Sequence, residues 1–172
     1  VLSTGPYIGW GWRHMLFYNN FGTADTPHLS VVDILTPHVR KIMEFFDISK
    51  PSTTMPLQAQ ISQHTTHSIG SRILDTAMSG DFNGDCINEA VVLDSSMETI
   101  KSVQLVDEND GNDEEMQAAE VWSLPLPGRL SSNVAAVGLR DGSGIALAAA
   151  SGRRVRFWLP RARHGANAAS IA

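Results

Sequence analysis

Apolar and polar positions alternate with a period of two in several short segments of the chain. The segment 55–62 places apolar residues on one parity, at Met55, Leu57, Ala59 and Ile61. This alternation predicts a half-buried strand, and Pro56, which has no N–H to donate, predicts that the strand lies at a sheet edge. The segment 154–159 alternates in the same way, and Val155, Phe157 and Leu159 are predicted to form its buried side.

A helical pattern is weak throughout the chain. No segment combines a long stripe of period 3.6 with a capping residue and a stop signal. The best helical candidate, 40–46, lies inside a segment that also fits a strand with two aromatic residues. We therefore predict an all-β chain.

Three segments of the chain repeat the same order of features: an apolar run, a polar loop, a second apolar run, a turn and a third run. The second runs begin near residues 29, 90 and 145, so the units are 61 and 55 residues apart. A fourth apolar run follows in the first two units, whereas the third unit stops short at Pro160. The repeated units cover about 15–63, 76–127 and 134–160.

Four short antiparallel strands in about 55–60 residues match the size of a β-propeller blade with a long loop. We interpret residues 1–160 as a partial β-propeller of about three blades, followed by an Ala/Arg-rich tail at 161–172. A β-sandwich with similar strands is the alternative. Because a ring needs at least about four blades, we expect other protein chains or a second copy to complete it.

The densest chemistry lies in the loop 81–89. Side-chain oxygens stand at relative positions 1, 3, 5 and 9, on Asp81, Asn83, Asp85 and Glu89. Calcium takes six to eight oxygen ligands, and alternate residues of a loop can turn toward it together with a backbone carbonyl at position 7, here Ile87. Apolar strands flank the loop, so the pattern predicts a strand–loop–strand calcium site, with a polar Asx-type turn as the alternative.

The residues 79–92, SGDFNGDCINEAVV, resemble the FG-GAP (VCBS-like) repeat of integrin-type β-propellers, and the resemblance is strongest over 77–93. It implies a calcium ion between strands of a blade. The implied ligands are Asp81, Asn83, Asp85, the carbonyl of Ile87, and Glu89. Cys86 departs from the family glycine at position 6, and a non-glycine residue in a left-handed turn costs about 1–2 kcal/mol, which lowers the expected affinity.

Composition and charge exclude several classes of protein and disfavour others. The net charge of −5 disfavours nucleic-acid partners, and the single cysteine excludes a disulfide scaffold. No apolar run reaches the ~18 residues of a membrane helix, so we expect no membrane span. No hydrolase, zinc-protease, phosphate-loop or dinucleotide motif occurs, and no catalytic residue is assigned.

We therefore expect a non-catalytic, calcium-binding β-propeller module that serves as an interaction or assembly subunit of a larger complex. Its expected place is extracellular, periplasmic or another calcium-rich compartment, including the periphery of a membrane complex. The alternative is a fragment of a carbohydrate-active enzyme, because some polysaccharide lyases resemble this kind of calcium-bearing propeller.

Three further segments have predicted roles. The segments 10–17 and 121–124 are apolar and lie near the ends of the repeat array, so we expect partner contacts there. The arginine-rich segment 153–163 is interpreted as an outward strand face and a solvated tail. His64 and His67 are three residues apart, and local hydrogen bonding is favoured over a shared metal because no third ligand is evident.

Overall fold

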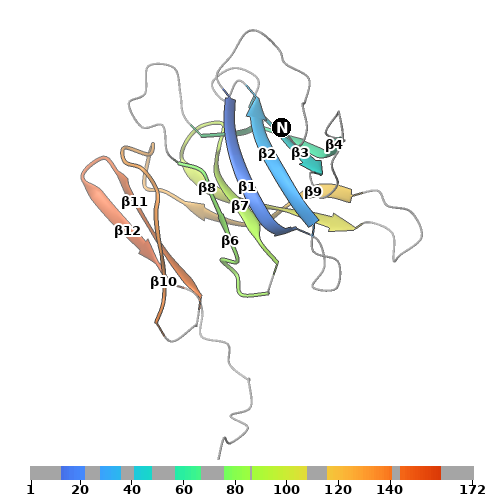
Figure 1. Cartoon of the computed structure of the whole chain (residues 1–172). Helices are drawn as coiled ribbons and strands as arrows, with labels where there is room; N and C mark the ends of the chain where they lie inside the picture. The colour runs from blue at the N-terminus through green and yellow to red at the C-terminus, as the bar shows by residue number, and fades with distance from the viewer. Residues whose placement is uncertain are drawn as a thin grey trace, which may run out of the picture.

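The computed structural model describes residues 13–21, 28–35, 41–47, 57–66, 76–85, 87–107, 116–140 and 144–159. These residues form twelve strands and no helix, so the prediction of an all-β chain is confirmed. Part of the sheet structure curls into a half-barrel (Figure 1). Within the described ranges, no helix has the length and apolar character needed to cross a bilayer.

The first sheet is an antiparallel meander of four strands in the order β1-β2-β3-β4. Its strands are β1 (Arg13–Phe21), β2 (His28–Leu35), β3 (Ile42–Asp47) and β4 (Leu57–Ser62). The segment with helical character is the strand β3, because Met43 and Phe45, two residues apart, both bury their side chains completely. The strand β4 lies at the sheet edge, as the sequence predicts.

The central sheet contains five strands built around β7. They are β5 (His64–Thr65), β6 (Met78–Gly80), β7 (Glu89–Asp94), β8 (Thr99–Asp107) and β9 (Met116–Pro125). The order is β5-β7-β8-β9, and β6 pairs with the opening half of β7 while β5 pairs with its end. This arrangement leaves the β6–β7 loop, which holds the predicted calcium ligands, at one end of the sheet.

The C-terminal sheet has three antiparallel strands in the order β10-β11-β12. They are β10 (Ala135–Gly138), β11 (Ile145–Ser151) and β12 (Arg154–Trp158). The prediction for β12 is wrong about which side is buried: Trp158 packs inward, whereas Val155, Phe157 and Leu159 are exposed. Alternation separates the two faces of a strand but does not say which faces the core, and here the larger indole ring takes the inner side.

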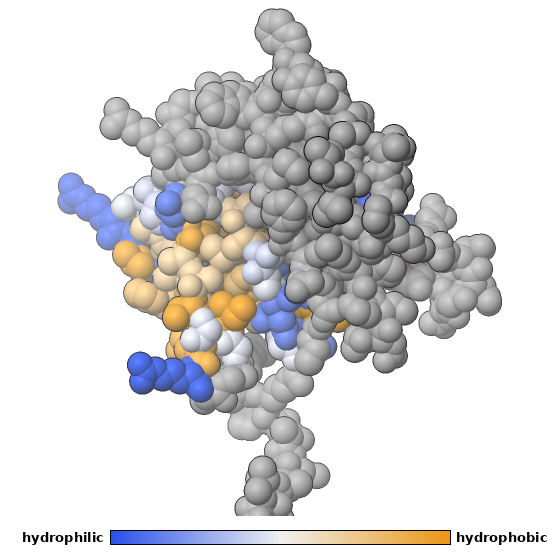
Figure 2. Space-filling model, viewed as in Figure 1, coloured by the Kyte–Doolittle hydropathy of each residue, from blue (hydrophilic) through white to orange (hydrophobic). Residues whose placement is uncertain are grey.

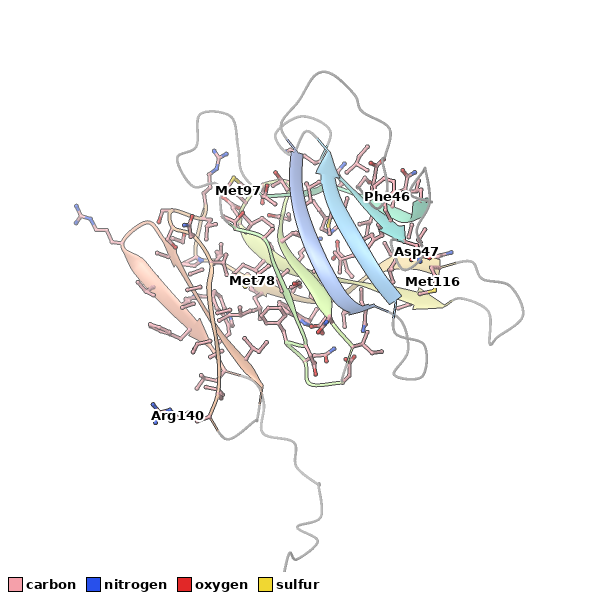
Figure 3. The ribbon with its side chains drawn as sticks, viewed as in Figure 1. Phe46, Asp47, Met78, Met97, Met116 and Arg140 are labelled. Carbon is pink, nitrogen blue, oxygen red and sulfur yellow. The ribbon has the colours of Figure 1, made fainter. Side chains whose placement is uncertain are left out.

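Two hydrophobic cores hold the three sheets together. The first and central sheets share Ile34, Met43, Phe45, Ala59, Ala90, Val92, Val103 and Leu105. The central and C-terminal sheets share Phe82, Val91, Leu93, Met97, Ile100, Leu147 and Ala149, with Trp122, Leu124 and Trp158 packed against them. Met78 and Met97 lie on the side of the central sheet that faces the C-terminal sheet (Figure 3). The continuous apolar run of β7 is therefore explained by burial of both its faces.

The first and central sheets also meet strand by strand. The contacts join β1 to β6, β4 to β9 and β3 to β5. The tail 161–172, Cys86, His67 and the segment 10–12 lie outside the described residues.

Candidate metal centre

The predicted calcium loop joins two paired strands. Gly80 at the end of β6 pairs with Glu89 at the start of β7, so the loop closes tightly and brings its two ends together. Gly84 adopts a left-handed conformation with φ of 80°, which glycine adopts without steric cost. Its N–H donates to Asp81 Oδ1. The loop thus folds into a turn in which the Asp81 carboxylate accepts a backbone N–H from within the loop.

Short hydrogen bonds fix the middle of the loop. Asp85 donates its N–H to Asn83 Oδ1 at 2.8 Å, and Ile87 donates its N–H to Asp85 Oδ1 at 2.8 Å. Asn83 Nδ2 donates to Asp85 Oδ2 at 2.9 Å. These bonds hold the exposed Asp85 carboxylate in a defined place.

Three carboxylates converge at this loop. One oxygen each from Asp81, Asp85 and Glu89 lies within 4.8 Å of the other two. Calcium–oxygen bonds of 2.3–2.6 Å place two ligands of one ion at most about 5 Å apart, so the three oxygens fit around a single calcium ion. All three donors are hard oxygens, which is the donor type that calcium prefers.

Glu89 is the most unusual member of the group because its side chain is fully buried, with 0% exposure. Its Oε2 accepts the N–H of Phe82 at 2.7 Å. Its Oε1 has no hydrogen-bond partner among the described residues. A buried carboxylate oxygen without a partner is costly, and a cation at this position would satisfy it.

Burial raises the pKa of Glu89 to about 7. Hydrogen bonds from the Phe82 N–H and the Trp122 side chain oppose this shift in the pKa of Glu89, whereas the nearby Asp85 and Asp81 charges add to it. Without a cation, Glu89 is therefore only partly ionised at neutral pH, because burial and the neighbouring Asp81 and Asp85 charges disfavour its carboxylate form. A divalent ion would lower the pKa of Glu89 again, because its positive charge favours the ionised carboxylate.

The structure brings three of the five predicted ligands together and places the other two beside them. Asn83 is exposed, and its oxygen accepts a backbone N–H within the loop. Ile87 is half-buried and reaches the group through its N–H, so the ligand role of its carbonyl stays a prediction.

Phe82 is a site residue to which the sequence analysis assigned no role. Its ring is 7% exposed and lies in the core between the central and C-terminal sheets. It meets Trp122 edge-on, with ring centroids 6.2 Å apart and planes at 70°. A side chain at Gly80 would come within 3.3 Å of this ring, so the glycine gives it room. The aromatic residue among the carboxylate and amide side chains that open this loop is the signal that identifies this anchor.

Two further buried polar groups lie near Glu89. Gln104 Nε2 and Ser102 Oγ have no hydrogen-bond partner among the described residues. The β7–β8 register pairs Ala90 with Val103, and its continuation places Gln104 opposite Glu89. The alternation of polar and apolar positions along β8 is the sequence signal for this buried polar row.

A separate polar cluster surrounds the buried His64. Its Nδ1 lies 2.7 Å from the Ser62 carbonyl, so local hydrogen bonding is confirmed, and its Nε2 lies 3.1 Å from Glu120 Oε1. Lys101 Nζ contacts the same oxygen at 2.5 Å. Burial lowers the pKa of His64, and the Ser62 carbonyl and Glu120 partly offset this shift. His64 lies in β5.

Comparison of the chain with family models, with curated proteins and with solved structures gives no match.

Proposed function

We propose that this chain is a calcium-binding β-propeller module that serves as an assembly subunit of a larger complex. The observation that carries the calcium proposal is the buried Glu89 carboxylate, which has one oxygen within 4.8 Å of oxygens of Asp81 and Asp85 and whose Oε1 has no hydrogen-bond partner among the described residues. The FG-GAP-like spacing of the loop supports the same ion.

The strand arrangement supports the blade interpretation. The first sheet is a four-stranded meander, and β6 to β9 repeat that order in the central sheet. The contacts β1–β6 and β4–β9 join strands at corresponding positions of these two sheets. Blades that stack face to face around a ring would make such contacts, and the three-stranded C-terminal sheet would be an incomplete third blade.

Calcium would act here as a structural ion. Bound by Asp81, Asp85 and Glu89, it would join the end of β6 to the start of β7 and compensate three clustered negative charges. Asn83 and the Ile87 carbonyl would supply the remaining protein oxygens, and water would complete the shell. Such a role fits an extracellular, periplasmic or other calcium-rich compartment.

Calcium is expected to stabilise the folded chain. An ion that binds only the folded state adds about 2.7 kcal/mol at a hundredfold excess over its Kd. Calorimetric titration and thermal unfolding should both show this effect, and Asp85→Ala should abolish it. Asp85 is exposed, so its replacement should leave the fold intact.

Glu98→Ala is the matched control, because Glu98 is an exposed carboxylate in the next turn along the chain. This variant should respond to calcium as the unmodified chain does. Magnesium should have a weaker effect, because it demands near-octahedral geometry and keeps its water. An unfolding curve that excess calcium and chelator leave unchanged would show that the loop is a plain hydrogen-bonded turn.

A further inference from the structure

The carboxyl group of Glu89 accepts hydrogen bonds from two described residues that lie far apart in the sequence. The first donor is the backbone N–H of Phe82, which lies 2.7 Å from Oε2. The second donor is the side chain of Trp122 on β9. The indole N–H is the one hydrogen-bond donor of a tryptophan side chain, so this group makes the bond. The loop therefore supplies one donor, and a strand outside the loop supplies the other.

The strand register explains how Trp122 reaches Glu89 from two strands away. Trp122 pairs with Ser102 on β8, and Ser102 pairs with Val91 on β7. Glu89 lies two residues before Val91, so their side chains leave the same face of the sheet. Neighbouring strands are about 4.8 Å apart, which places β9 about 10 Å from β7. A large side chain is needed to span this distance, and the residue between, Ser102, is small and fully buried.

The two donors also pack against each other. The rings of Phe82 and Trp122 meet edge-on, with centroids 6.2 Å apart and planes at 70°. Both rings belong to the core between the central and C-terminal sheets, where Phe82 is buried and Trp122 is half-buried. Phe82, Trp122 and Glu89 therefore form a closed set of contacts. In a close-packed interior, a shift of either donor disturbs the other.

The surroundings of these contacts are apolar. The C-terminal sheet packs on the core that holds both rings, and apolar residues gather over that sheet as well (Figure 2). A hydrogen bond to an ionised carboxylate is stronger in such surroundings than in water. An ionised carboxylate has about four lone-pair sites, so the two N–H donors leave acceptor capacity on Glu89 for a cation.

We propose that Trp122 is a positioning residue of the calcium centre, whose indole N–H holds the Glu89 carboxylate in the orientation that binds the ion. The inference rests on the calcium role proposed above and adds to it a residue from outside the loop. Groups that hydrogen-bond a metal-ligating carboxylate fix its orientation, and their loss typically lowers metal affinity by about 10–100-fold. Without the indole N–H, Glu89 would lose a charge-assisted hydrogen bond and its fixed orientation.

Trp122→Phe tests the proposal, because it removes the N–H and keeps an aromatic ring beside Phe82. We expect this variant to bind calcium about tenfold more weakly, or weaker still, in calorimetric titration. Trp158→Phe is the matched control, because Trp158 is half-buried against the same core but lies on β12. It loses the same atoms and should bind calcium as the unmodified chain does. The comparison therefore separates the indole N–H from a general loss of packing.

A second measurement uses the unmodified chain and does not depend on the folding of a variant. Calcium titration followed by NMR should move the indole N–H resonance of Trp122, because the ion and the indole share the Glu89 carboxyl group. The midpoint should match the calorimetric Kd, and the indole resonance of Trp158 should stay in place.

Three results would overturn the positioning role of Trp122. They are an unchanged calcium Kd in Trp122→Phe, an equal loss of affinity in Trp158→Phe, and a Trp122 indole resonance that calcium does not move. In each case, calcium binding that Asp85→Ala abolishes would still support the ion site. An unmodified chain that binds no calcium would instead overturn the ion site itself, and the positioning role with it.

Discussion

Phe82→Ala is expected to lower the free energy of unfolding by about 3–5 kcal/mol, the usual cost of removing a buried aromatic ring. The ring is 7% exposed and fills the core between the central and C-terminal sheets, where it meets Trp122 edge-on. The loss should also reduce calcium affinity, because the backbone N–H of Phe82 holds Glu89 Oε2 at 2.7 Å. Urea unfolding, with and without calcium, measures both effects.

Phe157→Ala is the matched control for this prediction. Its ring is 73% exposed, so its removal should change stability by no more than about 0.5 kcal/mol and leave calcium binding unchanged. Phe82→Leu should recover part of the stability, because it refills much of the space. Equal effects of the two alanine variants would mean that the loop is not anchored in this core.

The sequence predicts the strands well because their burial follows a simple period. The apolar parity of 55–62 predicts β4, the pattern of 90–94 predicts β7, and each falls within one or two residues of its strand. Predicting these strands requires only the local sequence, because a strand with one or both faces against a core shows that burial in its own pattern of apolar residues. The segment 40–46 was ambiguous only because short apolar runs suit both a strand and a helix.

Which sheet packs against which depends on residues far apart in the sequence, and predictions from sequence are least accurate for these contacts. The segment 121–124 is predicted to contact a partner, and in the structure Trp122 and Leu124 are partly buried against the core shared with the C-terminal sheet, while Val121 is exposed. The partner contact stays a prediction, and the packing of these two residues was not foreseen because nothing along the chain says which sheet covers which. For the same reason the exposed side of β12 was assigned to the wrong parity.

The candidate site was predictable to the extent that one loop supplies it. The spacing of Asp81, Asp85 and Glu89 anticipates the convergence of their oxygens, because the paired ends of β6 and β7 close the loop. The burial of Glu89 was not predictable from the spacing. Its hydrogen-bond donors are the Phe82 N–H and the Trp122 side chain, and the second of these lies two strands away, on β9.

Glu89 is expected to make the calcium-free chain less stable as the pH rises. Burial raises the pKa of Glu89 to about 7, above its ordinary value of 4.5. A carboxyl whose pKa is higher in the folded state favours folding while it is protonated. Its contribution is complete below about pH 4.5 and is lost as the pH rises through 7. The pKa difference corresponds to a loss of about 3 kcal/mol.

The comparison with Glu89→Gln isolates this effect, because the amide does not titrate and other groups change alike in both chains. Among these is His64, whose lowered pKa acts in the opposite sense and costs stability as the pH falls below about 6.5. Urea unfolding between pH 4.5 and 8 in the presence of chelator should show the stability of the unmodified chain falling relative to Glu89→Gln. Excess calcium should flatten this difference, since the ion favours the ionised carboxylate. A constant difference across this range would mean that Glu89 is ionised in the folded chain and already has a partner at Oε1.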